Sequence, residues 1–227
     1  MMFVALLNVC VVPGHFLLVN CAAIMLLTLH PENPQLRNIK TIVDCLNDGG
    51  VIIYPTDTIY GLGCNIFNPK AIERICRIKQ VDPSKAQLSF ICYDLSDLSN
   101  YTKSISTPLY RLLKSYLPGP YTFILPASKQ VPKILKSRKD TIGLRVPDNV
   151  IARCIIKQLG HPILSASLPG EMVEEYTDPE IMHANFKNLV DIVVDGGTGA
   201  MFPSTIVDCT SDEPVVIRKG LGVWEEN

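Results

Sequence analysis

Residues 49–64 read Gly49-Gly50-Val51-Ile52-Ile53-Tyr54-Pro55-Thr56-Asp57-Thr58-Ile59-Tyr60-Gly61-Leu62-Gly63-Cys64, and the rest of the chain is organised around them. The run 51–53 does not alternate with polar residues, which is typical of a strand buried on both faces of a sheet. Pro55 cannot donate to a strand ladder, so pairing is expected to end there. The polar residues 56–58 would then stand at the end of a rigid strand, within reach of a ligand. The pattern fits a plain strand, polar turn and second strand equally well, and both interpretations stay open.

Composition places the chain among globular proteins. Its 227 residues fit one large domain or two small ones, and 47% hydrophobic with 19% charged residues supply ample material for a core. The net charge of −1 argues against tight, purely electrostatic binding of nucleic acid, although a local basic cleft is compatible with it. The eight cysteines form no CxxC pair, which disfavours a zinc site or a thioredoxin-like motif and favours a reducing cytoplasm.

The first 24 residues differ in composition from the rest of the chain. Residues 1–29 contain no Lys, Arg, Asp or Glu, which invites a signal-peptide or membrane-anchor interpretation. A basic n-region is missing, and Asn8, Pro13 and Gly14 interrupt what would have to be a spanning helix. We therefore expect residues 1–24 to be an atypical extension upstream of a natural start at Met25, residues 25–227 to form the domain, and no association with a membrane; a signal or anchor is the alternative.

Helices and strands are expected to interleave from Met25 onward. Helices are predicted around residues 39–46 and over 69–78, 95–101, 107–116, 150–158 and 179–189, with 171–178 as a loop. Strands are predicted over residues 25–29, 51–53, 87–92, 121–126, 141–147, 162–167, 190–194, 204–208 and 214–218. This alternation predicts a single α/β domain with a mixed sheet.

Polar residues gather at the predicted strand ends. They are Thr56, Thr58, Lys79, Thr122, Arg145, Ser165, Ser167, Ser204, Thr205 and Arg218. The sequence contains no Ser-His-Asp arrangement, HExxH, EF-hand or Walker A motif, and hydroxyls with cations but without a nucleophile–base pair suit an anion-binding pocket. A nucleotide triphosphate would meet Lys as a point charge and Arg as a bidentate partner, with Mg²⁺ bridging its phosphates.

Taken singly, each of these residues has a simpler explanation. Lys79 could complement a helix dipole, Arg145 could be salt-bridged, and Arg218 could be a surface charge. Ser204 and Thr205 could merely start a strand. The number of such groups, rather than any one of them, favours a functional site.

The opening stretch and five further motifs, in order, resemble the YrdC-type threonylcarbamoyl-AMP synthases. The opening stretch 54–63 looks like the signature of that family. The others are Arg77-Ile78-Lys79, Leu117-Pro118-Gly119-Pro120-Tyr121-Thr122, Gly143-Leu144-Arg145-Val146-Pro147, Pro203-Ser204-Thr205-Ile206-Val207-Asp208 and Arg218-Lys219-Gly220. Together they span about Met25 to Gly222, nearly the whole chain after the extension.

The resemblance implies an open twisted mixed sheet flanked by helices, with a central concave basic cavity. It implies the formation of threonylcarbamoyl-AMP and pyrophosphate from L-threonine, bicarbonate and ATP, with Mg²⁺ accompanying ATP. The product would serve the t6A modification of tRNA through downstream transfer partners.

The resemblance also assigns roles to residues. Thr56, Thr58, Arg145, Ser165 and Ser204 would lie on the threonine side, with Arg145 facing the threonine carboxylate. Lys79, Thr122, Ser167 and Arg218 would lie on the nucleotide side. No catalytic residue and no protein metal ligand is assigned, because positioning and charge neutralisation suffice.

Two positions depart from the family pattern. The family carries Lys-x-Arg where this chain has Lys79-Gln80-Val81, and Lys85 could supply the missing charge. It carries Ser-Ala-Asn where this chain has Ser167-Leu168-Pro169. Both departures fall on the nucleotide side.

Two other functions are compatible with the sequence. One is an RNA- or tRNA-binding module, or a translation-related factor, that uses the concave face without catalysis; the near-neutral charge speaks against it. The other is a carbamoyl-transfer role like that of the YrdC-type module in hydrogenase-maturation proteins, whose acylphosphatase and zinc-finger segments have no counterpart in this sequence.

Overall fold

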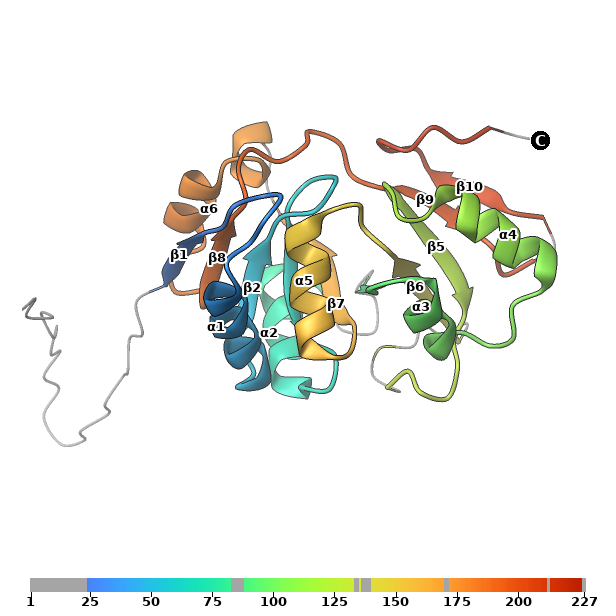
Figure 1. The fold of residues 1–227 in the computed structure, drawn as a ribbon, viewed down its shortest axis with the longest axis horizontal. Helices are drawn as coiled ribbons and strands as arrows, with labels where there is room; N and C mark the ends of the chain where they lie inside the picture. Colours follow the sequence, from blue (N-terminus) through green and yellow to red (C-terminus); the bar gives the residue numbers. More distant parts are fainter. Residues whose placement is uncertain are drawn as a thin grey trace, which may run out of the picture.

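The computed structural model describes residues 24–82, 88–132, 135, 140–169, 172–211 and 213–225. Of the predicted extension, only Ile24 falls within these ranges, and Lys85 lies outside them. The described residues form one mixed sheet flanked by helices, which confirms the predicted fold class (Figure 1).

The elements follow the predicted alternation. The strands are β1 (Met25–Thr28), β2 (Val51–Tyr54), β3 (Gly61–Asn65), β4 (Ser89–Ile91), β5 (Tyr121–Pro126), β6 (Thr141–Arg145), β7 (Ile163–Ser167), β8 (Ile192–Asp195), β9 (Thr205–Asp208) and β10 (Val215–Arg218). The helices are α1 (Leu36–Asn47), α2 (Pro69–Ile78), α3 (Leu95–Tyr101), α4 (Thr107–Tyr116), α5 (Val150–Leu159), the 3₁₀ turn η2 (Val173–Tyr176) and α6 (Pro179–Asn185).

The strand order in the sheet is β1-β8-β2-β3-β7-β4-β6-β5-β9-β10. The pairs β1–β8, β8–β2, β4–β6 and β5–β9 are parallel, and the remaining pairs are antiparallel. The sheet does not close, since β1 and β10 form its two edges. Strands distant in sequence therefore become neighbours, which brings separate motifs together.

The opening stretch forms the antiparallel pair β2–β3. All four residues of β2 are buried, as the uninterrupted apolar run predicts, and the strand ends immediately before Pro55. Gly63 lies under the ring of Tyr54: a Cβ at Gly63 would come within 2.8 Å of Tyr54 Cε1. Glycine is needed there because the aromatic ring occupies the space of a side chain.

Side chains on the two faces of the sheet enter different cores. Helices α2, α3, α4 and α6 pack on one face, around residues such as Ile53, Phe90 and Phe123. Helices α1 and α5 pack on the other face, against β2, β7 and β8 (Figure 1). Within the described part of the chain, β5, β6 and β9 contribute no side chain to this second core. The α1–α5 layer therefore covers only part of its face.

The residues predicted to start α2 and to end α1 do so in the structure. Asn68 caps α2 by accepting a hydrogen bond from the Ala71 N–H, and Pro69 occupies the first turn. Helix α1 is followed by Gly49 with φ of +86°, the conformation expected after a helix C-terminus.

Two predicted segments differ most from the structure. Helix α6 ends at Asn185 rather than at residue 189, with Asn188 in a left-handed conformation that a helix cannot contain. The segment predicted as loop over 171–178 contains η2, whose start is held by a hydrogen bond from the Met172 N–H to the Glu175 carboxylate. Both misses concern short turns, where periodicity carries little signal.

Candidate functional site

Hydroxyl-bearing and small residues line the sheet face that the α1–α5 layer leaves uncovered. Strand registers place Ser89 of β4 opposite both Ser165 of β7 and Gly143 of β6. A Cβ at Gly143 would come within 2.7 Å of Ser89 Oγ and 3.3 Å of Thr122 Cγ2, so these side chains share a face. Arg145 follows Gly143 by two residues and therefore points to the same side. The register thus lines up side chains from β7, β4, β6 and β5.

The polar turn after β2 is held by its own hydroxyls. Thr56 Oγ1 donates to the Ile59 carbonyl (2.9 Å), accepts from the Thr58 N–H (3.0 Å) and lies 3.0 Å from Thr58 Oγ1. Because the Thr56 hydrogen is used on Ile59, the Thr58 hydroxyl donates to Thr56. Thr58 is only 1% exposed. In this structure the two threonines fix the turn that carries Asp57.

Asp57 pairs with Arg145, and the sequence reasoning did not include it among the site residues. The Arg145 Nη2 donates to Asp57 Oδ1 in a contact where both side chains are almost fully buried. Two further buried atoms, Asp57 Oδ2 and Arg145 Nε, have no hydrogen-bond partner in the described structure. The salt bridge considered for Arg145 is therefore formed, on an interior strand of the sheet. The signal was the carboxylate inside the opening motif itself.

Ser165 is oriented by a buried tyrosine. The Tyr54 hydroxyl donates to Ser165 Oγ over 2.8 Å, and burial raises the pKa of Tyr54 to about 12. Tyr54 thus stays a donor at neutral pH, so the Ser165 hydrogen is free to point elsewhere. The charges of Arg145 and Asp57 also act on the Tyr54 hydroxyl, so the Tyr54–Ser165 hydrogen bond lies beside the Asp57–Arg145 ion pair. Ser165 is therefore prepared to donate to a ligand acceptor.

Ser204 lies at the centre of a second cluster. Its hydroxyl is 2.9 Å from Thr122 Oγ1, and Arg218 donates to its carbonyl through Nε (3.1 Å) and Nη2 (2.8 Å). The neighbouring Thr205 donates its hydroxyl to the Gly222 carbonyl (2.6 Å), so its side chain ties down the C-terminal segment. Burial lowers the pKa of Arg218, and the positive charge of Arg145 lowers it further. Two guanidinium groups thus lie close enough to repel each other, an arrangement that an anion would stabilise.

Lys79, which follows α2, contacts the end of β7. Its Nζ donates to the Ser167 carbonyl over 2.6 Å, and burial lowers the pKa of its ammonium group. Lys79 therefore reaches across to β7 instead of only complementing the helix dipole. The Ser167 side chain is exposed.

The structure joins residues that the resemblance assigned to different sides. Ser204, assigned to threonine, bonds directly to Thr122 and Arg218, assigned to the nucleotide. A Ser-Ala pair also stands two residues before Ser167-Leu168, at Ser165-Ala166, and aligning the family pattern there would put Ser167 at the asparagine position. Val81, at the arginine position, is exposed beyond the end of α2.

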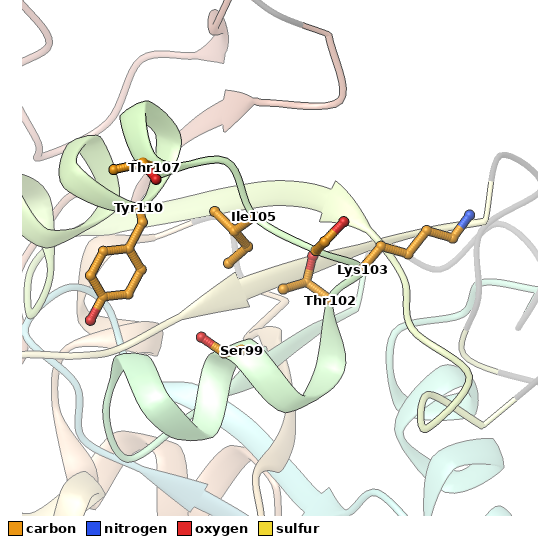
Figure 2. Close-up of a pocket in the computed structure, with 7 residues that line it drawn as sticks. Ser99, Thr102, Lys103, Ile105, Thr107 and Tyr110 are labelled. Carbon is orange, nitrogen blue, oxygen red and sulfur yellow. The ribbon is translucent and has the colours of Figure 1, made fainter.

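A pocket of about 410 Å³ lies elsewhere, between α3 and α4 (Figure 2). It is lined by Ser99, Thr102, Lys103, Ser104, Ile105, Thr107 and Tyr110. Figure 2 shows Ser99 coming from α3 and Tyr110 from α4, with the connecting segment between them. None of the predicted site residues lines this pocket.

Neither a metal-binding cluster nor a membrane-spanning helix occurs among the described residues. No group of three or more His, Cys, Asp or Glu side chains is placed to hold a metal ion there. Across the same residues, no helix combines the length and the apolar character needed to cross a bilayer.

Comparisons with known proteins agree with this fold and these motifs. The family model Sua5_yciO_yrdC, described as "Telomere recombination", matches residues 44–220. The protein YciO of Escherichia coli K12, named as uncharacterized, is 45% identical over 197 residues, 86% of this chain and 94% of YciO. A threonylcarbamoyl-AMP synthase of Chromobacterium violaceum is 35% identical over 182 residues, 80% of this chain and 93% of its own.

Solved structures give the same result. The crystal structure of E. coli YciO superposes with a TM-score of 0.82 at 42% identity, covering 88% of this chain and 97% of YciO. Sua5 of P. abyssi, in complex with L-threonine, superposes with a TM-score of 0.78 at 27% identity, covering 86% of this chain and 57% of Sua5. The chain therefore belongs to the Sua5/YciO/YrdC family.

Proposed function

We propose that this chain is an L-threonylcarbamoyladenylate synthase. It would convert L-threonine, bicarbonate and ATP into threonylcarbamoyl-AMP, pyrophosphate and water, for the t6A modification of tRNA. The observation that carries the proposal is the convergence of buried Arg145, half-buried Arg218 and oriented hydroxyls on the sheet face beyond the α1–α5 layer. The L-threonine complex of the related Sua5 and the name of the C. violaceum relative support it.

The proposed chemistry needs positioning more than acid–base catalysis. The threonine amine captures CO₂ as a carbamate, and a carbamate oxygen then attacks the α-phosphorus of ATP with pyrophosphate leaving. The anionic reactants repel each other, so Arg145, Arg218 and Lys79 would neutralise their charge while the hydroxyls of Ser165 and Ser204 align them. Mg²⁺ would arrive with ATP, coordinated by its phosphates.

Pyrophosphate release tests the proposal. Purified protein with MgATP should release pyrophosphate only when both L-threonine and bicarbonate are present. Release without threonine, or no release at all, would refute the proposed function. Salt-dependent tRNA binding without any turnover would instead support the non-catalytic RNA-binding alternative.

Two lysine variants sharpen this test. Lys79→Ala should abolish turnover and leave the fold intact, because it removes a cation that reaches the site at β7. Lys40→Ala is the matched control, since Lys40 is exposed on α1 and pairs with Asp44, which is exposed as well. Near-normal activity of Lys79→Ala would mean that the phosphates bind elsewhere.

A further inference from the structure

Strand β10 is an open edge of the sheet. It pairs with β9 on one side, and no strand of the described residues pairs with its other side (Figure 1). A bulge between Val216 and Arg218 leaves Ile217 without a partner residue on β9. An edge strand carries backbone N–H and C=O groups with which a strand of another chain can pair. The outer side of β10 therefore offers a place for a second chain.

Exposed residues alternate along this edge with partly buried ones. Glu213, Val215, Ile217 and Lys219 are exposed, whereas the residues between them are partly buried. Val215 and Ile217 are 54% and 55% exposed, although both are large apolar residues. The two middle residues of β1, at the opposite edge of the sheet, instead pack against the cores. Strand β10 thus presents apolar side chains that the rest of the described chain does not cover.

The exposed charges at the two ends of this stretch have opposite signs. Glu213 precedes β10 and Lys219 follows it, and neither forms an ion pair with another described residue. Two copies of β10, placed antiparallel about a two-fold axis at Val216, would bring Glu213 opposite Lys219 of the other copy. Val215 would then lie opposite Ile217. Opposite charges across antiparallel strands attract and like charges repel, so residues 213–219 complement themselves in this arrangement.

We propose that β10 pairs with β10 of a second copy of this chain, antiparallel about a two-fold axis, and continues the sheet into a homodimer. The same surface serves both copies in such a contact, so the assembly closes at two copies instead of growing. A parallel pairing in the same register would set each charge against its own kind. The charges therefore select the antiparallel dimer over other pairings of the exposed edge. The inference does not depend on the proposed function.

The contact is small, which predicts a weak dimer. Residues 213–219 of each copy form the strand pair, at the low end of specific interfaces. Phe202 and Leu221 add exposed apolar surface beside the end of β10, because the Leu221 N–H donates to the Pro203 carbonyl over 2.8 Å. A dissociation constant of about 1–100 μM is expected for an interface of this size.

Sedimentation velocity over a range of protein concentrations tests the inference. The native protein should be monomeric well below about 1 μM and mostly dimeric at about 500 μM. Glu213→Lys and Lys219→Glu should each weaken self-association by about tenfold or more, because two attractive pairs become two repulsive ones. Asp44→Lys and Lys40→Glu are the matched controls, since they make the same changes of charge on the exposed face of α1 and should keep the native association.

Mixing the two single variants tests the antiparallel geometry itself. A Glu213→Lys chain carries lysines at both ends of β10 and a Lys219→Glu chain carries glutamates, so the two should bind each other more tightly than either binds itself. The double variant Glu213→Lys/Lys219→Glu should restore the homodimer, because it exchanges the two signs.

Three results would overturn the inference. One is a native protein that stays monomeric at about 500 μM. Another is a dimer that neither single variant weakens, which would lie on a different surface. The third is a pair of single variants that fail to associate when mixed while their far-ultraviolet circular dichroism is unchanged.

Discussion

Removing either partner of the Asp57–Arg145 pair should destabilise the fold strongly. The Arg145 side chain is 7% exposed and the Asp57 side chain is 11% exposed, so solvent screens little of their interaction. Breaking a buried pair by neutralising one partner costs about 3–5 kcal/mol, because an uncompensated charge remains inside the protein. Against a typical total of about 5–15 kcal/mol, this is a large fraction of the stability of the domain.

A double-mutant cycle measures the coupling directly. Asp57→Asn and Arg145→Met each leave one buried charge, whereas the double variant leaves none. The loss in free energy of unfolding should therefore be smaller in the double variant than the sum of the losses in the two single variants, by about 1–3 kcal/mol. Urea unfolding is the assay, and with a slope of about 2 kcal/mol per molar each single variant should lower the midpoint by about 1.5–2.5 M.

The exposed pair Lys40–Asp44 supplies the control for this cycle. These side chains are mostly in solvent, so Asp44→Asn should leave the urea midpoint unchanged. Single variants at Asp57 and Arg145 that cost under about 1 kcal/mol, or effects that simply add, would refute the argument that the pair is buried and coupled.

Three further predictions follow from burial. Burial holds the pKa of Lys79 below 10.5, so its ammonium group loses its proton at a lower pH than that of an exposed lysine. As pH rises toward 10.5, the affinity for ATP should therefore weaken, while the contribution of Lys79 to folding stability should improve. Lys79→Arg should remove both effects. Gly63→Ala should cost about 1–3 kcal/mol in thermal unfolding, because the new Cβ would lie 2.8 Å from the buried ring of Tyr54, and an unchanged melting temperature would contradict this packing. Partial burial raises the pKa of the Cys45 thiol to about 12, so mass-spectrometric mapping should show slower labelling of Cys45 by a thiol reagent at pH 8 in the native protein than in urea; equal rates would contradict the raised pKa of this half-buried thiol.

Local chemistry made most of the secondary structure predictable. The uninterrupted apolar run 51–53 specified a buried strand, and Pro55 specified its end, because proline cannot donate to the ladder. Asn68 and Pro69 specified the start of α2 through a side-chain cap and a preset φ. The boundary of α6 and the turn η2 escaped prediction because a few residues contain too little periodic signal.

The residue types of the candidate site were also visible in the sequence. Hydroxyls and cations at strand ends predicted an anion-binding site, and the motifs predicted the family that the comparisons establish. The assignments of these residues to threonine or nucleotide remain predictions. The sequence alone did not single out Asp57, because a carboxylate in a polar turn is usually just solvated.

Sequence by itself therefore determined the elements, the family and the kinds of side chain available. Only the tertiary structure decided which of them meet, since the strand order places β7 beside β3 and β4, and β9 beside β5. Arg145 reaches Asp57 across 88 positions in the chain, and Tyr54 reaches Ser165 across 111. No local pattern encodes such contacts, because they arise from the pairing of distant strands, which is fixed by the packing of the whole sheet between its helices.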